Sequence, residues 1–149
     1  MEEAYRKWSV DLVGYASALV GSVDAADLVA DIFAGLIRRG DESWAEVRDA
    51  RAYLFRSVTN SARMHMRSRE RRRARENGWP MALPQGELFS DPAVRAALAG
   101  LSVRQRAAVF LTYWEDLGTG EVARRMGVSD GAVKRHLARG RSALREELS

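Results

Sequence analysis

The residues best suited to chemistry in this sequence are basic, and they gather in two short clusters. Residues 63–75 contain seven arginines and one glutamate, and residues 133–145 contain five basic side chains and no acid. A planar guanidinium matches phosphate oxygens and the edge of guanine with paired hydrogen bonds. Residues 1–49 are the opposite, with ten acids and five bases. This asymmetry predicts a polyanion at the basic clusters and a different partner at the acidic front.

Side chains for covalent or metal chemistry are scarce. The sequence has no cysteine, which excludes disulfides, cysteine–zinc sites and thiol nucleophiles. The two histidines, His65 and His136, each lie in a basic segment without a neighbour at metal-binding spacing. No glycine-rich stretch follows a strand, so a nucleotide-binding loop is not expected. We therefore predict a binding protein and not an enzyme, with no catalytic residue, no metal and no cofactor.

The composition of the chain indicates a folded protein outside the membrane. Its 149 residues are 46% hydrophobic and 30% charged, which is ordinary for a protein with a core. No apolar run approaches the roughly 20 residues that a transmembrane helix needs. The first residues, MEEAYRKWSVD, lack the apolar segment of a secretory signal. We expect a cytoplasmic protein without membrane insertion.

Apolar residues recur at helical spacing along most of the chain, and no segment shows the sustained alternation of a strand. The predicted fold is therefore all-α. Residues 78–92 hold all three prolines, so a helix cannot run through them. We predict a linker there, between small helical domains at residues 1–77 and 93–149. The expected helices cover about residues 3–19, 25–39, 50–76, 93–99 and 103–114, with a pair of helices from residue 119 onward.

The second expected helix carries an acidic stripe. Asp24, Asp27 and Asp31 are three and four residues apart, so they share one side of the helix. The helix dipole stabilises carboxylates near the N-terminal end, where Ser22 or Asp24 can also cap the helix. Leu28 belongs to the apolar positions that recur at core-facing spacing, together with Ile32, Phe33 and Leu36.

The last fifty residues have the spacing of a helix-turn-helix unit that begins at Thr119. Ala123 is small where the two helices must pass closely, and Gly127 falls in the turn, where a left-handed backbone is needed. Apolar residues occupy the positions that close the small core between the helices, namely Val122, Met126, Val128, Val133 and Leu137. Several constraints met in one register make this a specific prediction.

The start of the second helix of this unit is the expected contact with DNA bases. Ser129 is predicted as the N-cap, which places Asp130 and Gly131 in the first turn. Such a turn enters the major groove, and a glycine there lets the backbone approach the DNA. Lys134 and Arg135 follow on the outward side as candidate base readers. Arg139 is suited to phosphates.

Three sequence segments, which together cover nearly the whole chain, resemble a known family. The segment LSVRQRAAVFLTYWEDLGTGEVARRMGVSDGAVKRHLARGRSALREEL contains the triplet RQR and the pair Tyr113-Trp114. The front half contains DAADLVADIFAGLIRR and then ARAYLFRSVTNSARMHMRSRERRR. The first segment resembles region 4 of the bacterial extracytoplasmic-function (ECF) sigma factors of RNA polymerase. The other two resemble regions 2.2 and 2.3 to 2.4 of the same family, in the order in which the family has them.

The resemblance implies a function and a set of partners. It implies a protein that binds core RNA polymerase, through the β′ clamp helices and the β flap, and directs promoter-specific transcription initiation. Promoter DNA and an anti-sigma factor are the other implied partners, and the implied location is the cytoplasm, on the nucleoid when polymerase is bound. The implied polymerase contacts are Asp24, Asp27, Leu28, Asp31 and Ile32.

The resemblance also implies which residues meet the two promoter elements. The implied −35 contacts are Ser129, Asp130, Gly131, Lys134, Arg135 and Arg139, on the duplex. Residues 40–49, which include Trp44, match the loop that captures a flipped base of the −10 element. The opened −10 strand would be held by Arg56, Asn60, Arg63 and Arg67.

Two other classes of protein remain as alternatives. An autonomous dimeric helix-turn-helix regulator explains the second half of the chain, but it leaves the arginines of residues 63–75 and the acidic stripe without a role. An anti-sigma or adaptor protein predicts binding to sigma factor or polymerase without promoter readout. Binding of a palindromic duplex without polymerase would indicate the regulator.

Overall fold

The computed structural model describes residues 1–75 and 91–148, and every regular element in them is a helix. The predicted all-α fold is confirmed in these ranges, while most of the predicted linker, residues 78–90, lies outside them. The helices are α1 (Glu2–Val20), α2 (Ser22–Arg39), α3 (Asp41–Ala45), α4 (Ala50–Arg75), α5 (Pro92–Ala99), α6 (Val103–Tyr113), α7 (Thr119–Met126) and α8 (Asp130–Leu148).

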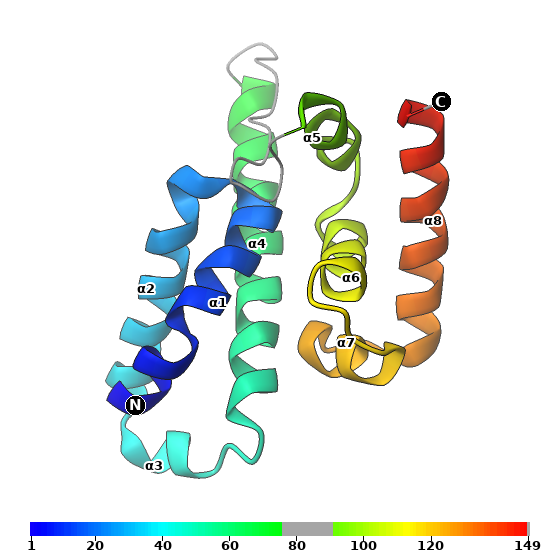
Figure 1. Ribbon diagram of the computed structural model, residues 1–149. Coiled ribbons are helices and arrows are strands. Elements are labelled where there is room, and N and C mark those ends of the chain that lie inside the picture. The colour runs from blue at the N-terminus through cyan, green and yellow to red at the C-terminus, as the bar shows by residue number, and fades with distance from the viewer. Residues whose placement is uncertain (76–90, 149) are drawn as a thin grey trace.

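The first four helices form one group in which α1 packs against both α2 and α4 (Figure 1). Gly21 separates α1 from α2 with φ of 93°, a conformation that favours glycine and turns the chain back within a single residue. The helix α4 begins where the side chain of Asp49 accepts a hydrogen bond from the amide of Ala52 at 3.1 Å. The expected cap at Ser22 or Asp24 is wrong, because α2 already starts at Ser22 and has no side-chain cap.

The second group consists of α5 to α8, with α8 packed along α5, α6 and α7. The start of α6 carries a capping box, in which Ser102 accepts from the amide of Gln105 and Gln105 accepts from the amide of Ser102. Gly140 of α8 lies close to α6, since a side-chain carbon built there would stand 2.9 Å from Val109. This contact brings the axes of α6 and α8 close together.

The two groups of helices share a continuous core. The ring of Tyr15 on α1 lies 5.2 Å from the ring of Phe55 on α4 and 5.8 Å from the ring of Phe110 on α6. Helix α7 packs against α4, and α6 packs against both α1 and α4 (Figure 1). The two halves of the chain are therefore packed together in this structure.

Candidate functional site

The helix-turn-helix unit consists of α7, the turn at Gly127 and α8. Gly127 has φ of 70° and ψ of 37°, and its amide donates to the carbonyl of Ala123 at 2.8 Å. The hydroxyl of Ser129 accepts from the amide of Ala132 at 3.1 Å and so caps α8. These two features confirm the predicted turn and cap. The predicted core of the unit is also present, with Val122, Ala123, Met126, Val133 and Leu137 buried and Val128 partly buried.

The start of α8 presents an exposed cationic surface, which we call the recognition surface. It consists of the expected −35 residues Ser129, Asp130, Gly131, Lys134, Arg135 and Arg139, all of them exposed. Lys134, Arg135 and Arg139 have no hydrogen bond or ion pair within residues 1–75 and 91–148. These three positive charges are therefore available to an external anion.

A groove of about 600 Å³ lies between α2 and α4, and we call it the acidic groove. All five expected polymerase contacts line it: Asp24, Asp27, Leu28, Asp31 and Ile32. The opposite wall comes from α4 and includes Tyr53, Ser57, Ser61 and His65. Sequence reasoning missed these four residues, although they recur every four positions on one polar side of α4.

Asp24 is the member of the groove that ties α2 to α4. Its carboxylate lies 3.0 Å from Nε2 of His65 and 3.6 Å from Nη1 of Arg69. Arg69 also donates to the carbonyl of Val20 at 3.3 Å. Asp24 therefore has a structural role that Asp27 and Asp31, which are exposed on the same helix, do not share.

The expected −10 residues follow one line along α4, with spacings of four, three and four positions. Arg56, Asn60 and Arg67 are exposed and Arg63 is half-buried. Asn60 lines the acidic groove, so the structure places it with the expected polymerase contacts as well. Arg56 lies against the turn of the helix-turn-helix unit, because a side-chain carbon built on Gly127 would stand 3.0 Å from Cδ of Arg56.

The loop expected to capture a base contains the short helix α3. Trp44 of α3 packs edge-on against Tyr53, with ring centres 6.3 Å apart. Beside it is a hollow of about 260 Å³ whose lining includes Trp8 and Trp44. The aromatic rings thus stand at the end of α4 from which the line of −10 residues starts.

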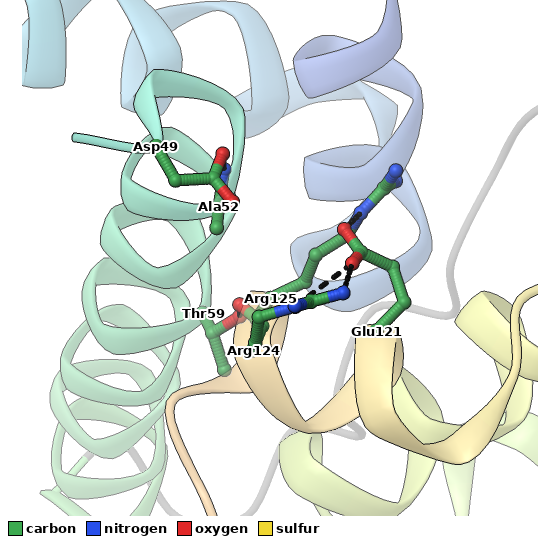
Figure 2. Close-up of polar contacts among 6 residues, drawn as sticks. All are labelled: Asp49, Ala52, Thr59, Glu121, Arg124 and Arg125. Atoms are coloured by element: carbon green, nitrogen blue, oxygen red, sulfur yellow. Dashed lines mark hydrogen bonds and ion pairs between the residues drawn. The ribbon is translucent and has the colours of Figure 1, made fainter.

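The interface between the two halves is built around Arg125 of α7, which is only 2% exposed. Its guanidinium carbon lies 4.5 Å from the centre of the Phe55 ring, and its Nε donates to Glu121 at 3.2 Å. Figure 2 shows Thr59 of α4 beside Arg125, with Glu121 joined to both Arg124 and Arg125. Burial raises the pKa of the Glu121 carboxyl, but the hydrogen bonds from Arg124 and Arg125 outweigh it and leave that pKa lowered.

Thr59 completes the polar part of this interface. Its hydroxyl donates to the carbonyl of Phe55 at 2.9 Å, so the phenol of Tyr15 must donate to the same hydroxyl at 2.7 Å. Burial raises the pKa of the Tyr15 phenol, and the Thr59 hydrogen bond and the charge of Arg125 oppose that shift. Tyr15 therefore stays neutral and serves as a buried donor.

Within residues 1–75 and 91–148, no three acidic, histidine or cysteine side chains stand together in a way that could hold a metal ion. None of the helices in this part of the chain is long and apolar enough to cross a membrane.

Comparison with known proteins identifies the family. The model of Sigma-70 region 2 matches residues 4–72, and the model of Sigma-70 region 4 matches residues 92–144. The RNA polymerase sigma-E factor of Streptomyces coelicolor is 34% identical over 133 residues, which span 85% of this chain and 72% of that protein. The chain belongs to the ECF sigma factors. The ECF RNA polymerase sigma factor SigM of Mycobacterium tuberculosis is 30% identical over 125 residues, or 83% of this chain and 63% of that protein.

The fold of this ECF sigma factor is also that of a solved relative. The sigma factor RpoE of Bartonella quintana, crystallised in complex with the anti-sigma factor NepR, superposes with a TM-score of 0.75 at 23% identity. The match covers 99% of this chain and 98% of that chain. The predicted resemblance is confirmed: the chain is a sigma factor that directs transcription initiation, in a family of non-catalytic initiation factors.

Three buried polar residues of this sigma factor escaped sequence reasoning, namely Thr59, Arg106 and Arg125. Arginine is normally exposed even where its neighbours in a helix are apolar, so the sequence did not predict that Arg106 and Arg125 are buried. The available signal was weak: Arg125 sits between Val122 and Met126, on the apolar side of α7. The burial of these residues depends on the packing of the two halves.

Proposed function

We propose that this sigma factor binds core RNA polymerase through the acidic groove and reads the two promoter elements with the recognition surface and α4. The observation that carries the proposal is the recognition surface itself. Its cations follow a capped turn of a helix-turn-helix unit and have no counter-ion in the described part of the chain. Exposed charges arranged this way are suited to base edges and phosphates in a major groove.

The −35 element would be read as duplex DNA. Lys134 and Arg135 stand one turn beyond the cap, where side chains reach base edges, and Arg139 is placed for a phosphate. Each bidentate contact between an arginine and guanine discriminates by about 1–3 kcal/mol, or roughly 5- to 150-fold in affinity. The phosphate contacts add affinity that falls as salt rises.

The −10 element would be held as an opened strand along α4. Arg56, Asn60, Arg63 and Arg67 supply one amide and three cations in a line. The loop at residues 40–49 brings Trp44 to the start of that line, where an unstacked base could be held against an aromatic ring. Unstacking costs a few kcal/mol, which the complex with polymerase must supply.

Core polymerase would bind in the acidic groove. Its lining combines the exposed Asp27 and Asp31 with the apolar Leu28 and Ile32, while Arg38 and Arg39 line its other end along α2. The carboxylates and the apolar side chains together are suited to a basic helical partner such as the β′ clamp helices. The second half would contact the β flap.

As a factor that acts with RNA polymerase, the protein is assigned to the cytoplasm.

We propose that the chain divides into residues 1–77, a linker at 78–92 and residues 93–149, and that the two halves separate on the promoter. The −10 and −35 elements lie about 25 base pairs apart, or roughly 85 Å at 3.4 Å per base pair. Arg56 of the −10 line touches the turn that precedes the recognition surface. The packed form cannot span both elements, so it represents a state that an anti-sigma factor could hold.

A transcription assay tests this function. Core polymerase, a promoter library and the purified chain are combined, and run-off transcripts are sequenced. We expect a promoter-selective transcript that depends on the chain. Replacement of Lys134 and Arg135 by alanine should remove the −35 preference while polymerase binding persists. The control pair, Arg6→Ala with Lys7→Ala, removes two exposed charges from α1 and should keep that preference. Absence of any selective transcript would contradict the proposed function.

A further inference from the structure

The end of α6 and the middle of α8 meet at Tyr113 and Arg141, a contact that belongs neither to the recognition surface nor to the acidic groove. The Nε atom of Arg141 donates a hydrogen bond to the Tyr113 hydroxyl at 2.5 Å. The guanidinium carbon lies 5.6 Å from the centre of the phenol ring. Because Arg141 is exposed and Tyr113 is 53% exposed, the contact is made at the surface, where a third molecule can reach it.

Close packing of α6 against α8 fixes the backbone of both partners. Gly140, which directly precedes the cation of the pair, lies so close to α6 that a side-chain carbon built on it would stand 2.9 Å from Val109. Tyr113 follows Val109 by four residues, about one turn, and so stands on the same side of α6. Trp114 stacks on the buried ring of Phe110, with the ring planes 8° apart, and so anchors the end of α6. The place of this surface pair is therefore set by the core beneath it.

The contact with Tyr113 does not neutralise the charge of Arg141. A tyrosine hydroxyl accepts a hydrogen bond without supplying a carboxylate, and Arg141 has no ion pair within residues 1–75 and 91–148. Arg124 of α7 differs, since its guanidinium is paired with the carboxylate of Glu121. Of the five N–H groups of Arg141, Tyr113 takes the one on Nε, and the four on the Nη atoms have no acceptor in the same ranges. These paired donors fit two oxygens of one phosphate.

Arg141 shares its side of α8 with Lys134, a member of the recognition surface. Seven residues separate the two, which is close to two full turns, and both side chains are exposed. Arg141 also lies eleven residues beyond Asp130, the first residue of α8, or roughly 16 Å along the helix axis. The major groove is about 12 Å wide, so a helix that enters it with its first turn reaches the DNA backbone at this distance. Arg141 is thus placed for a phosphate and not for a base edge.

We propose that Arg141 binds a phosphate of the −35 duplex and that Tyr113 is the positioning residue that orients it. The proposal rests on the proposed function and deepens it, because it adds support from α6 to the DNA contact made by α8. The Tyr113 hydroxyl holds the Nε edge of the guanidinium and leaves the two Nη atoms for the phosphate. A long side chain that is oriented before binding loses less conformational freedom when the phosphate arrives. Tyr113 would therefore raise affinity without touching the DNA.

The pair is expected to set affinity and not sequence preference. A phosphate carries no information on the base beside it, so loss of Arg141 should weaken binding to every −35 sequence by a similar factor. Loss of Lys134 or Arg135, the expected base readers, should instead change which sequences are preferred. A change of preference caused by Arg141→Gln would make Arg141 a base reader and contradict the proposal.

The binding experiment uses core polymerase assembled with the full chain. Its probe is a fluorescein-labelled duplex that carries a −35 element selected in run-off transcription and ends before the −10 element. Fluorescence anisotropy is measured over a range of salt. Arg141→Gln should weaken binding about tenfold and reduce the slope of log Kd against log salt by about one, since one phosphate contact is lost. Tyr113→Phe keeps the ring, removes the hydroxyl and should weaken binding about threefold. In the Arg141→Gln background Tyr113→Phe should have no further effect.

Two variants of α1 are the matched controls for this experiment. Tyr5 is 51% exposed, close to the value for Tyr113, and Arg6 is an exposed arginine. Tyr5→Phe and Arg6→Gln should each change the affinity for the duplex less than about twofold. Equal losses in the control variants would overturn the proposal, because they would indicate general charge attraction. Thermal unfolding verifies that every variant is folded, and a Tyr113→Phe variant that loses stability but not affinity would reduce the pair to a structural contact.

Uncharged phosphates in the duplex test the contact from the side of the DNA. Methylphosphonate replaces one phosphate at a time along both strands of the −35 element. At one position the wild-type chain should lose affinity and Arg141→Gln should not, because the charge that Arg141 meets is already absent. If no position behaves in this way, Arg141 does not bind a phosphate. An effect of Tyr113→Phe that is missing in the wild-type chain, or that persists beside Arg141→Gln, would overturn the role of Tyr113.

Two further outcomes separate this inference from the proposed function. If Arg141→Gln weakens the binding of core polymerase and leaves the affinity for DNA unchanged, the pair contacts polymerase and the inference is wrong. If the wild-type chain gives promoter-selective transcripts while both variants bind the duplex as it does, the inference alone fails. The proposed function fails only if the wild-type chain itself gives no selective transcript.

Discussion

The guanidinium of Arg125 stacks on the ring of Phe55, 4.5 Å from its centre, and so joins the second half of the chain to the first. Arg125 lies on α7 and Phe55 lies on α4. Within the described residues, Arg125 is the only charged residue of these two helices that is buried. The Nη1 atom of Arg125 has no acceptor within residues 1–75 and 91–148. Separation of the two helices would expose this atom to water, which can supply the missing acceptor.

The first prediction concerns this contact. Arg125→Ala should destabilise the chain by about 1–3 kcal/mol, since it removes the cation–π contact and the packing of the arginine stem. Urea unfolding measures the effect. Arg124→Ala is the matched control, because Arg124 is exposed and pairs with the same Glu121, and it should cost less than about 1 kcal/mol. Equal costs would mean that Arg125 does not hold the halves together.

The turn glycine provides a second prediction. Gly127→Ala should destabilise the chain by about 1–2 kcal/mol, because φ of 70° is unfavourable for alanine and the new methyl group would press on Arg56. Gly120→Ala is the control, since nothing lies within 4 Å of that position in α7. It should stabilise the chain by up to about 1 kcal/mol through helix propensity. Thermal unfolding of both variants compares them, and a neutral Gly127→Ala would contradict the strain at this turn.

Substitution of Gly131 should have opposite effects on stability and on the expected contact with DNA. In the first turn of α8 a side-chain carbon would meet nothing closer than 3.6 Å, so Gly131→Ala should raise stability by up to about 1 kcal/mol. The added methyl group would nevertheless stand where the backbone is expected to approach the −35 duplex. We expect weaker transcription from −35-dependent promoters by the more stable variant. Unchanged transcription would show that α8 does not dock closely through this turn.

The acidic groove supports a prediction on polymerase binding. Asp27→Asn and Asp31→Asn should weaken binding to core polymerase several-fold without loss of stability, because both carboxylates are exposed and unpaired in the described residues. Asp24→Asn should lower stability as well, since it removes the negative charge that contacts His65 and Arg69. Asp11→Asn, on the exposed side of α1, is the control. If it weakens polymerase binding as much as the groove variants, the groove is not the contact.

The depressed pKa of His136 makes stability depend on pH. Burial lowers this pKa, and Arg63 of α4, Arg104 of α6 and Arg135 and Arg139 of α8 lower it further. As pH falls below about 6.5, the unfolded chain binds a proton at this position before the folded chain does, so stability is lost. His136→Gln should reduce this loss. Urea unfolding at pH 7.5 and 5.5 measures it, and an identical pH response in the variant would rule out His136 as its source.

Local features of this protein were predictable from the sequence because neighbouring residues decide them. The turn at Gly127 needs a left-handed backbone, the cap at Ser129 needs one hydroxyl two or three residues before an amide, and the stripe of Asp27 and Asp31 needs only helical spacing. The expected polymerase contacts also emerged together in one groove, since a single helix carries all five. The confirmed all-α fold follows from the same periodicity.

Long-range contacts were not predictable in this way. Thr59 and Arg125 are 66 residues apart, and nothing near either residue indicates that they meet. Asp24 has the residue type of a helix cap, yet its carboxylate contacts His65 and Arg69, which lie 41 and 45 residues further along the chain. The sequence by itself determined the helices, the turn and the charge of each surface, through interactions within a few residues. The packing of α4 against α6 and α7 was decided only in the tertiary structure, because it depends on an apolar core shared by residues far apart in the chain.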